Sequence, residues 1–111
     1  MLNAMKAKLL ESKNCIVTGG ARGIGKAIVK RFLEEGCNVV FADIREELGK
    51  QVERELSKLG DVHFIKADVS NENDVKNLVN SALKIFNEPR IDVLINNAVI
   101  AKFEMLEDIS L

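Results

Sequence analysis

The stretch that decides the fold is Thr18-Gly19-Gly20-Ala21-Arg22-Gly23-Ile24-Gly25, which places four glycines within seven positions. It follows Cys15-Ile16-Val17, an apolar run typical of a buried strand. Apolar residues at helical spacing continue to Leu33, and Gly36 stands where helices commonly stop. Because glycine accepts positive φ angles and has no Cβ, such a turn lets backbone N–H groups approach a phosphate at a helix N-terminus. The stretch predicts a phosphate-binding turn; a tight turn without ligand is the alternative.

The rest of the chain alternates strand and helix patterns. Strands are expected at residues 15–17, 38–42, 62–65 and 91–95, and helices at 24–33, 48–59 and 75–86. Ser70 is the expected N-cap of the third helix, and Gly60 and Pro89 mark the ends of the second and third. This alternation implies an α/β fold with a parallel sheet and right-handed crossovers. The first two helices should cover one face of the sheet and the third helix the other.

Composition sets the class of protein. The 111 residues are 47% hydrophobic and 30% charged, enough for one domain over residues 1–111 and unlike a disordered chain. The formal net charge of −1 provides no electrostatic footprint for nucleic acid or an anionic membrane. No apolar run approaches the roughly 20 residues of a membrane helix. Neither a nucleic acid nor a membrane is therefore an expected partner.

The first residues are predicted to be a mobile lead-in, over residues 1–12, to the first strand. Met1 to Glu11 lacks the apolar region of a secretory signal, so we expect a cytoplasmic protein. A short mitochondrial presequence is the alternative, because no acidic residue precedes Glu11.

Two ligands compete for the glycine turn. Gly20, Gly25 and Lys26 satisfy the spacing of a nucleoside-triphosphate loop, but Ala27 stands where a hydroxyl should hold Mg²⁺. A dinucleotide site instead requires an acidic residue at the end of the second strand, about 20 residues on, and Asp43 meets that requirement. The dinucleotide interpretation is favoured.

Three motifs in this order resemble the short-chain dehydrogenase/reductase family over residues 13–111. They are Thr18-Gly19-x-x-x-Gly23-x-Gly25, Asp68-Val69 after the third strand, and Asn96-Asn97-Ala98 after the fourth. The resemblance implies a Rossmann-like, doubly wound parallel sheet with strand order 3-2-1-4, truncated after the fourth strand. It implies these cofactor-binding roles: Gly19, Gly23 and Gly25 shape the pyrophosphate loop, Arg22 and Ile24 line it, Asp43 holds the adenosine ribose, Asp68 and Val69 border the adenine, and Asn96 and Ala98 lie beside the cofactor. Val99 departs from the family, which usually has Gly there.

The resemblance implies a partial dinucleotide-binding domain of an oxidoreductase that acts on alcohols or carbonyls. Asp43 favours NAD over NADP, because a carboxylate repels a 2′-phosphate, although Arg22 and Arg45 could contact one. The family's catalytic Tyr has no counterpart, since the chain contains no Tyr, so we assign no catalytic residue and expect no turnover by this chain alone. The alternatives are a non-catalytic dinucleotide-binding module and an inactive remnant.

Three further expectations concern single features. The fourth strand should be an open apolar edge through which the chain self-associates or binds a complementing fragment. Cys15 and Cys37 are not spaced as a disulfide framework or a zinc site, and we expect buried, reduced thiols. His63, the only histidine, is expected at the surface or at a sheet edge rather than as a metal ligand.

Overall fold

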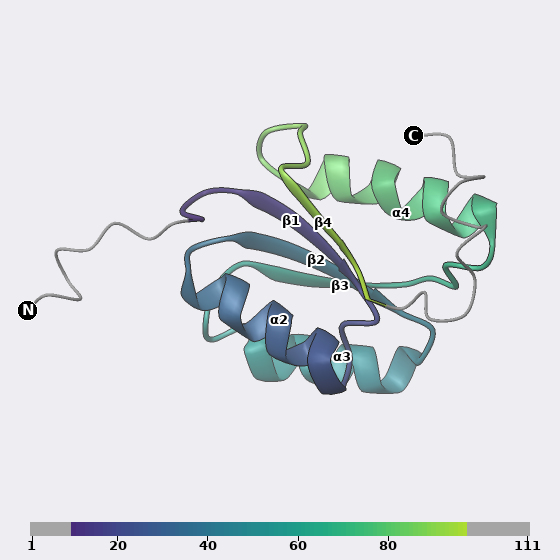
Figure 1. The fold of residues 1–111 in the computed structure, drawn as a ribbon, viewed down its shortest axis with the longest axis horizontal. Helices are drawn as coiled ribbons and strands as arrows, with labels where there is room; N and C mark the ends of the chain where they lie inside the picture. The colour runs from purple at the N-terminus through teal and green to yellow at the C-terminus, as the bar shows by residue number, and fades with distance from the viewer. Residues whose placement is uncertain (1–9, 98–111) are drawn as a thin grey trace, which may run out of the picture.

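The computed structural model describes residues 10–97 and contains one four-stranded parallel sheet (Figure 1). The elements follow the predicted alternation: β1 (Asn14–Thr18), α2 (Gly23–Glu34), β2 (Asn38–Asp43), α3 (Glu46–Leu56), β3 (Val62–Lys66), α4 (Glu72–Ile85) and β4 (Val93–Asn96). The strand order is β3-β2-β1-β4, which confirms the predicted Rossmann-like parallel sheet. Among residues 10–97, no helix has the length and apolar content that crossing a bilayer requires.

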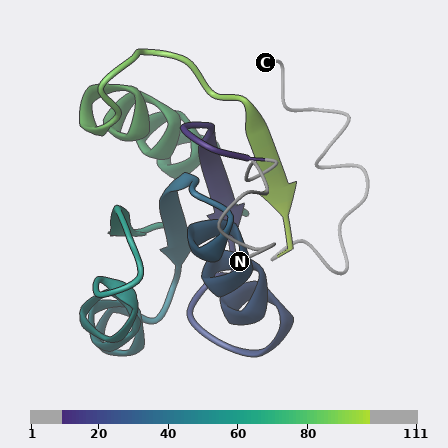
Figure 2. The same ribbon diagram turned by 90° about the vertical axis from the view of Figure 1, so that its left-hand side faces the viewer.

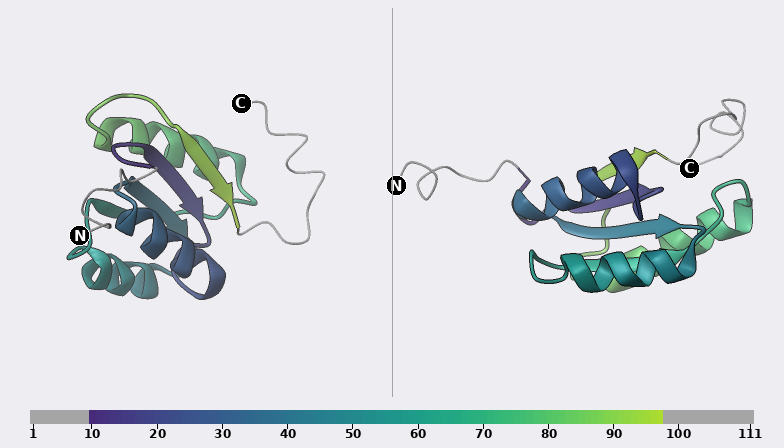
Figure 3. Two further views of the ribbon diagram at one scale, coloured as in Figure 1. Left: turned by 60° about the vertical axis from the view of Figure 1, so that its left-hand side comes forward. Right: turned by 90° about the horizontal axis from the view of Figure 1, so that it is seen from below.

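Helices cover both faces of the sheet, as predicted. The views in Figures 2 and 3 place α2 and α3 on one face and α4 on the other. Two separate core clusters correspond to these faces: Val29, Leu33 and Val52 pack against Val17 and Phe41, whereas the second cluster joins α4 to the opposite side. Its buried members are Ile16, Val40, Ala42, Ala67, Leu78, Ala82 and Phe86.

Strand side chains alternate between these two clusters because successive residues of a strand point to opposite faces. The parallel register pairs Cys15 with Val39 on the α2/α3 face and Ile16 with Val40 on the α4 face. All five residues of β1 are buried. This double burial explains why the central strands are apolar throughout rather than alternating.

The helix ends differ from the prediction at two places. Asn71, not Ser70, caps α4: its side-chain oxygen accepts a hydrogen bond from the backbone N–H of Asp74 at 3.0 Å. The Ser70 hydroxyl instead donates to the carboxylate of Asp68 at 2.6 Å, so it is engaged in the turn before the helix. The second helix ends at Leu56 rather than near Gly60, and residues 57–59 form a turn.

The two outer strands of the described sheet differ in what contacts their free edges. On β3, the backbone N–H of Phe64 donates to the Glu53 carboxylate at 2.8 Å, so α3 satisfies a donor of that edge. Within residues 10–97, β4 pairs only with β1, and Leu94 remains 48% exposed. Self-association or fragment binding through β4 stays a prediction.

The sequence around the start of β1 is fixed by tertiary contacts. Of the lead-in predicted over residues 1–12, residues 10–12 form a turn in which the Ser12 N–H donates to the Gly36 carbonyl at 3.0 Å. Leu10 packs against the α2/α3 core. His63 lies on β3, an outer strand of the described sheet, where it is partly exposed with its Nε2 2.8 Å from Asp61, in line with the surface or edge position expected.

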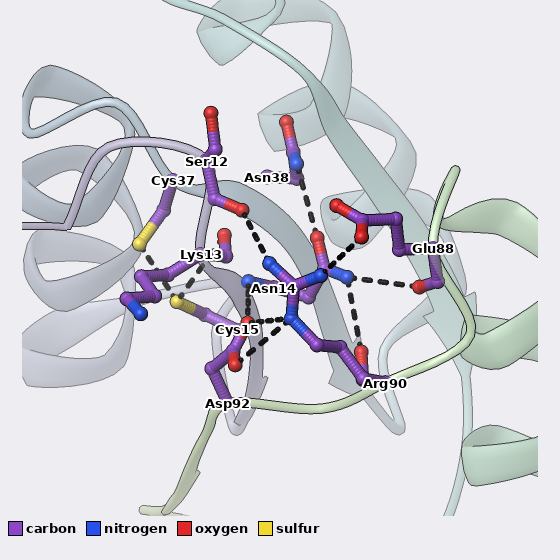
Figure 4. Close-up of polar contacts among 9 residues, drawn as sticks. All are labelled: Ser12, Lys13, Asn14, Cys15, Cys37, Asn38, Glu88, Arg90 and Asp92. Carbon is purple, nitrogen blue, oxygen red and sulfur yellow. Dashed lines mark hydrogen bonds and ion pairs between the residues drawn. The ribbon is translucent and has the colours of Figure 1, made fainter.

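Asn14 joins the loop after α4 to the sheet (Figure 4). Its side-chain N–H₂ donates to the carbonyl oxygens of Glu88 and Arg90, each at 3.0 Å, and its oxygen accepts from Asn38 at 3.0 Å. The Asn14 backbone N–H donates to Asp92 at 2.8 Å, and the Asp92 N–H returns a bond to the Asn14 carbonyl at 2.8 Å. One 2%-exposed side chain therefore holds β2, β1 and the entry to β4 together.

Replacing Asn14→Ala should lower the free energy of unfolding by about 2 kcal/mol, because three polar groups lose their partner in a mostly buried site. Urea denaturation followed by circular dichroism measures this change. The matched control is Asn77→Ala on the exposed side of α4, which should stay within about 0.5 kcal/mol of the original chain. Equal effects of the two substitutions would contradict the role of Asn14.

Asp92 should make this network sensitive to acid. The hydrogen bond from the Asn14 N–H, followed by the bonds from Arg90, lowers the pKa of Asp92 below its ordinary value of 3.8. A carboxylate with a lowered folded-state pKa contributes stability above its unfolded pKa and loses it as the pH falls through the folded value. The stability difference between the original chain and Asp92→Asn should therefore shrink between about pH 5 and pH 2, and a constant difference would refute it.

Candidate functional site

A cavity of about 390 Å³ opens at the carboxyl ends of the strands. Ligands of doubly wound folds bind in a crevice outside this end of the sheet, where the strand order reverses. The reversal here lies between β1 and β4. On one side of β1 the sheet continues to β2 and β3, and on its other side lies β4. The residues that line the cavity are Gly19, Arg22, Gly23, Asp43, Ile44, Arg45, Ala67, Asp68, Val69 and Asn97.

Six of the residues singled out from the sequence line this cavity: Gly19, Arg22, Gly23, Asp43, Asp68 and Val69. Ile24, Gly25 and Asn96 are not among its lining residues, although all three lie on the elements that form it. Ala98 and the unusual Val99 lie outside the described residues. The structure thus brings the three sequence motifs to one end of the sheet, where some of their residues line the cavity and others do not.

The N-terminus of α2 faces the cavity without a side-chain cap. Arg22 occupies the N-cap position with an extended backbone, and within the described part of the chain no side chain caps this helix or places an acid in its first turn. The first N–H groups of a helix lack intrahelical partners and carry the positive end of its dipole. This end of α2 is therefore suited to hold an anion.

Gly23 leaves this helix end open to a ligand. It has φ +59°, and a Cβ built there would meet nothing within 4 Å. Neighbouring protein atoms would therefore leave room for a side chain at this position. A side chain at this position would enter the space beside the helix N-terminus, where an anion would lie.

Gly25 has the opposite role, because the backbone packs tightly around it. A Cβ there would overlap the carbonyl oxygen of Gly19 and lie 2.7 Å from the Asn97 side-chain nitrogen. The Asn97 amide donates to the Gly19 carbonyl at 3.3 Å and so ties the end of β4 to the glycine turn. Gly25 shapes the site by close approach rather than by contact with its interior.

Asp43 is held rigidly at the end of β2. One carboxylate oxygen accepts from the Ala21 N–H at 3.1 Å, and the other accepts from the Arg45 N–H at 3.0 Å. The Arg45 guanidinium lies 3.7 Å from the same carboxylate and is half-exposed. Asp43 therefore presents a buried, oriented negative charge to the cavity with a cation beside it.

Asp68 forms a second acidic point on the cavity wall. Its carboxylate accepts hydrogen bonds from the side chain and the backbone N–H of Ser70, at 2.6 and 2.9 Å, and these bonds lower the pKa of Asp68. Its backbone N–H donates to Asp74 at 2.8 Å, which fixes the turn before α4. The group consequently stays ionised near neutral pH and can accept hydrogen bonds from a ligand.

Asn96 has a structural position between strands. Its side-chain oxygen accepts a hydrogen bond from the Thr18 hydroxyl at 3.1 Å and thereby links β4 to β1 at the base of the glycine turn. Its neighbour Asn97, which was not singled out, is the member of this pair that lines the cavity. Alternation along the strand was the available signal, because adjacent residues point in opposite directions.

Sequence reasoning missed Ile44 and Ala67 as cavity residues; Arg45, which it named only as a residue that could contact a phosphate, lines the cavity as well. Ile44 is 56% exposed, although it directly follows the buried β2. An exposed apolar side chain at a cavity mouth can contact a flat apolar ligand. Within residues 10–97, no group of three or more His, Cys, Asp or Glu side chains is arranged to hold a metal ion.

The fold is that of a doubly wound α/β protein, and the cavity lies where such folds bind their ligands. The family model for short chain dehydrogenase matches residues 13–111. An uncharacterized oxidoreductase from Thermotoga maritima is 47% identical over 93 residues, which cover 83% of this chain and 36% of the relative. The chain therefore belongs to the short-chain dehydrogenase family, a family of oxidoreductases, and spans about a third of the length of that relative.

Two solved structures support the same assignment. The Pseudomonas aeruginosa RhlG/NADP active-site complex has a TM-score of 0.76 and 32% identity, with 91% of this chain and 40% of that chain covered. A short chain dehydrogenase/reductase from Burkholderia phymatum in complex with NAD has a TM-score of 0.72 and 28% identity, with 77% and 30% covered. One relative is thus bound to NADP and the other to NAD.

The packing around Gly25 generates a test. Gly25→Ala should lower the free energy of unfolding by about 1–3 kcal/mol, because the new methyl group displaces the Gly19 carbonyl or the α2 backbone. Gly60→Ala is the control: its Cβ would lie 3.5 Å from Leu33, an ordinary contact, so its effect should be about 0.5 kcal/mol or less. Urea unfolding of both variants decides, and a Gly25→Ala variant as stable as the control would exclude the tight contact.

Proposed function

We propose that this chain is the NAD-binding part of an oxidoreductase that transfers hydride between NAD and an alcohol or carbonyl substrate. The observation that carries the proposal is a single cavity lined by both the uncapped N-terminus of α2 and the Asp43 carboxylate. The first feature suits a phosphate and the second a ribose, and a dinucleotide contains both groups.

The phosphate end of the site consists of backbone rather than side chains. Gly19 and Gly23, both with positive φ angles, bound the cavity at the start of α2. Their N–H groups and the helix dipole favour the negative charge of a pyrophosphate, and the open space at Gly23 is the cradle that a Cβ would fill. This is the fit expected between a dinucleotide and the residues present.

The ribose end rests on Asp43. Each carboxylate oxygen already accepts one backbone N–H, and each retains a second acceptor position for a ribose hydroxyl. A 2′-phosphate would bring a second negative charge against this carboxylate, so NAD is favoured over NADP. Arg45 reduces this preference, because its guanidinium is close enough to attract a phosphate.

The adenine would lie against Asp68 and Val69, where an ionised carboxylate can accept a hydrogen bond from the exocyclic amino group. When bound, the nicotinamide dinucleotide supplies or accepts hydride. The 111 residues include no Tyr, so this chain offers no phenol to exchange a proton with a substrate carbonyl. We therefore propose that it binds the cofactor without turnover on its own.

The central test compares NAD and NADP binding to the 111-residue chain by isothermal titration calorimetry. NAD should bind more tightly than NADP. Asp43→Asn should weaken NAD by about 10-fold or more, because a charge-assisted hydrogen bond is replaced by a weaker one. The same variant should narrow or invert the preference, because the charge that repels the 2′-phosphate is gone.

Two further variants make this test specific. Asp61→Asn is the matched control: the same substitution at the opposite end of β3 should leave both affinities unchanged. Gly23→Ala should weaken NAD and NADP alike, because it strains the backbone at φ +59° and places a methyl group in the open space beside the helix N-terminus. Tighter binding of NADP than NAD would overturn the cofactor preference, and failure of the folded chain to bind either would overturn the proposed function.

A further inference from the structure

Cys15 and Cys37 form a close pair at the end of β1 opposite the cavity. Their Sγ atoms lie 2.7 Å apart, and both residues are free thiols with at most 2% exposure (Figure 4). This separation exceeds the roughly 2.05 Å of a disulfide bond but is shorter than the van der Waals contact of two non-bonded sulfur atoms, so the two thiols lie closer than ordinary packing places them. Both thiols are buried, as the sequence led us to expect; their contact was not expected.

The backbone on both sides fixes the pair. The Asn38 N–H donates to the Lys13 carbonyl at 2.8 Å, which sets β1 and β2 in register next to the two cysteines. The Cys37 N–H donates to the Phe32 carbonyl at 3.0 Å, and Gly36 turns the chain with φ +90°. Both side chains belong to the α2/α3 core. Backbone hydrogen bonds on both sides therefore hold the two cysteines at positions where their sulfur atoms lie close together.

The surroundings offer these thiols little other chemistry. The Cys15 sulfur lies 4.0 Å from the Lys13 carbonyl, which is a long and weak contact. The described residues place no third metal-binding side chain beside the pair. Burial, and then the contact with Cys37, raises the pKa of Cys15, whereas the hydrogen bond with Cys15 partly offsets the rise that burial produces in the pKa of Cys37.

We propose that Cys15 and Cys37 are a reversible dithiol–disulfide site that a small hydroperoxide oxidises. The Cys37 thiol gives up its proton through water, its sulfur attacks one peroxide oxygen, and the O–O bond breaks; the released hydroxide takes up the proton and leaves as water, with a sulfenic acid on Cys37. The Cys15 sulfur then attacks the Cys37 sulfur, the S–O bond breaks, and a second water leaves. Two thiols and hydrogen peroxide thus give one disulfide and two water molecules. A dithiol reductant reverses the oxidation by thiol–disulfide exchange.

Cys37 is the first sulfur to react because it lies in the turn before β2 and retains slight exposure, whereas Cys15 has none. A hydroperoxide is the fitting oxidant because it is small and uncharged and the pair is enclosed. A bulky disulfide reagent would require the turn to open. The contact with Cys15 places the second thiol where the sulfenic acid forms.

The disulfide would close a loop over residues 15–37, which contains the glycine turn and all of α2. A cross-link of this length stabilises the folded chain by restricting the unfolded one. It lies at the amino end of β1, whereas the cavity begins beyond the carboxyl end at Gly19. Oxidation therefore cross-links the two ends of the strand-turn-helix unit and leaves the cavity free.

The test treats the folded 111-residue chain with hydrogen peroxide and then blocks remaining thiols under denaturing conditions. The oxidised chain should lose two hydrogens, about 2 Da, and remain monomeric on a non-reducing gel. Trypsin should release residues 14–22 joined to residues 32–45, and dithiothreitol should separate them. The melting temperature should rise by about 10 °C on oxidation and return on reduction.

Cys15→Ala and Cys37→Ala are the controls, with alanine chosen because both sites are apolar. Neither variant should gain stability on oxidation. Where a variant does not fold, the linked peptides of the original chain still decide the outcome. Recovery of both thiols unoxidised, addition of oxygen to either sulfur without a cross-link, or disulfides only between chains would each overturn the proposal. None of these measurements depends on dinucleotide binding.

Discussion

Hydrogen bonding along both edges of β1 is the constraint on which the rest of the structure depends. The strand pairs in parallel with β2 on one side and β4 on the other, and all five of its residues are buried. Parallel pairing aligns strand ends, so whatever follows β1, β2, β3 and β4 gathers at one edge. The cavity is the direct consequence, because its lining residues come from the segments that follow these four strands.

The two ends of β1 carry different kinds of chemistry. Beyond Thr18, glycines permit backbone to approach a ligand, and the carboxylate of Asp43 is oriented by two backbone N–H groups. At the amino end, Asn14 satisfies the loop carbonyls before β4, and Cys15 touches Cys37. The carboxyl end of β1 borders the cavity, whereas contacts of Asn14 and Cys15 at its amino end hold neighbouring segments of the sheet together.

The match to the short-chain dehydrogenase family covers most of this chain but only about a third of the length of the Thermotoga maritima relative. The described residues offer a cavity at the carboxyl ends of the strands, and the proposed function is confined to the phosphate, ribose and adenine regions that we propose for that cavity. The relatives in complex with NAD and NADP share this fold. In the proposed function, the balance between the Asp43 carboxylate and the Arg45 guanidinium sets the preference between the two cofactors.

Periodicity and glycine spacing are local properties, so the amino-acid pattern predicted the order of elements, the strand-turn-helix unit and the acidic residue at the end of β2. Helix boundaries were predicted less accurately: Asn71 rather than Ser70 caps α4, because the Ser70 hydroxyl is already hydrogen-bonded to Asp68. Only the tertiary structure brought Asn97 to the glycine turn, Asn14 to the α4–β4 loop and Cys15 to Cys37. These contacts join positions 22 to 78 residues apart, and parallel register, which no local pattern encodes, decides which of them meet.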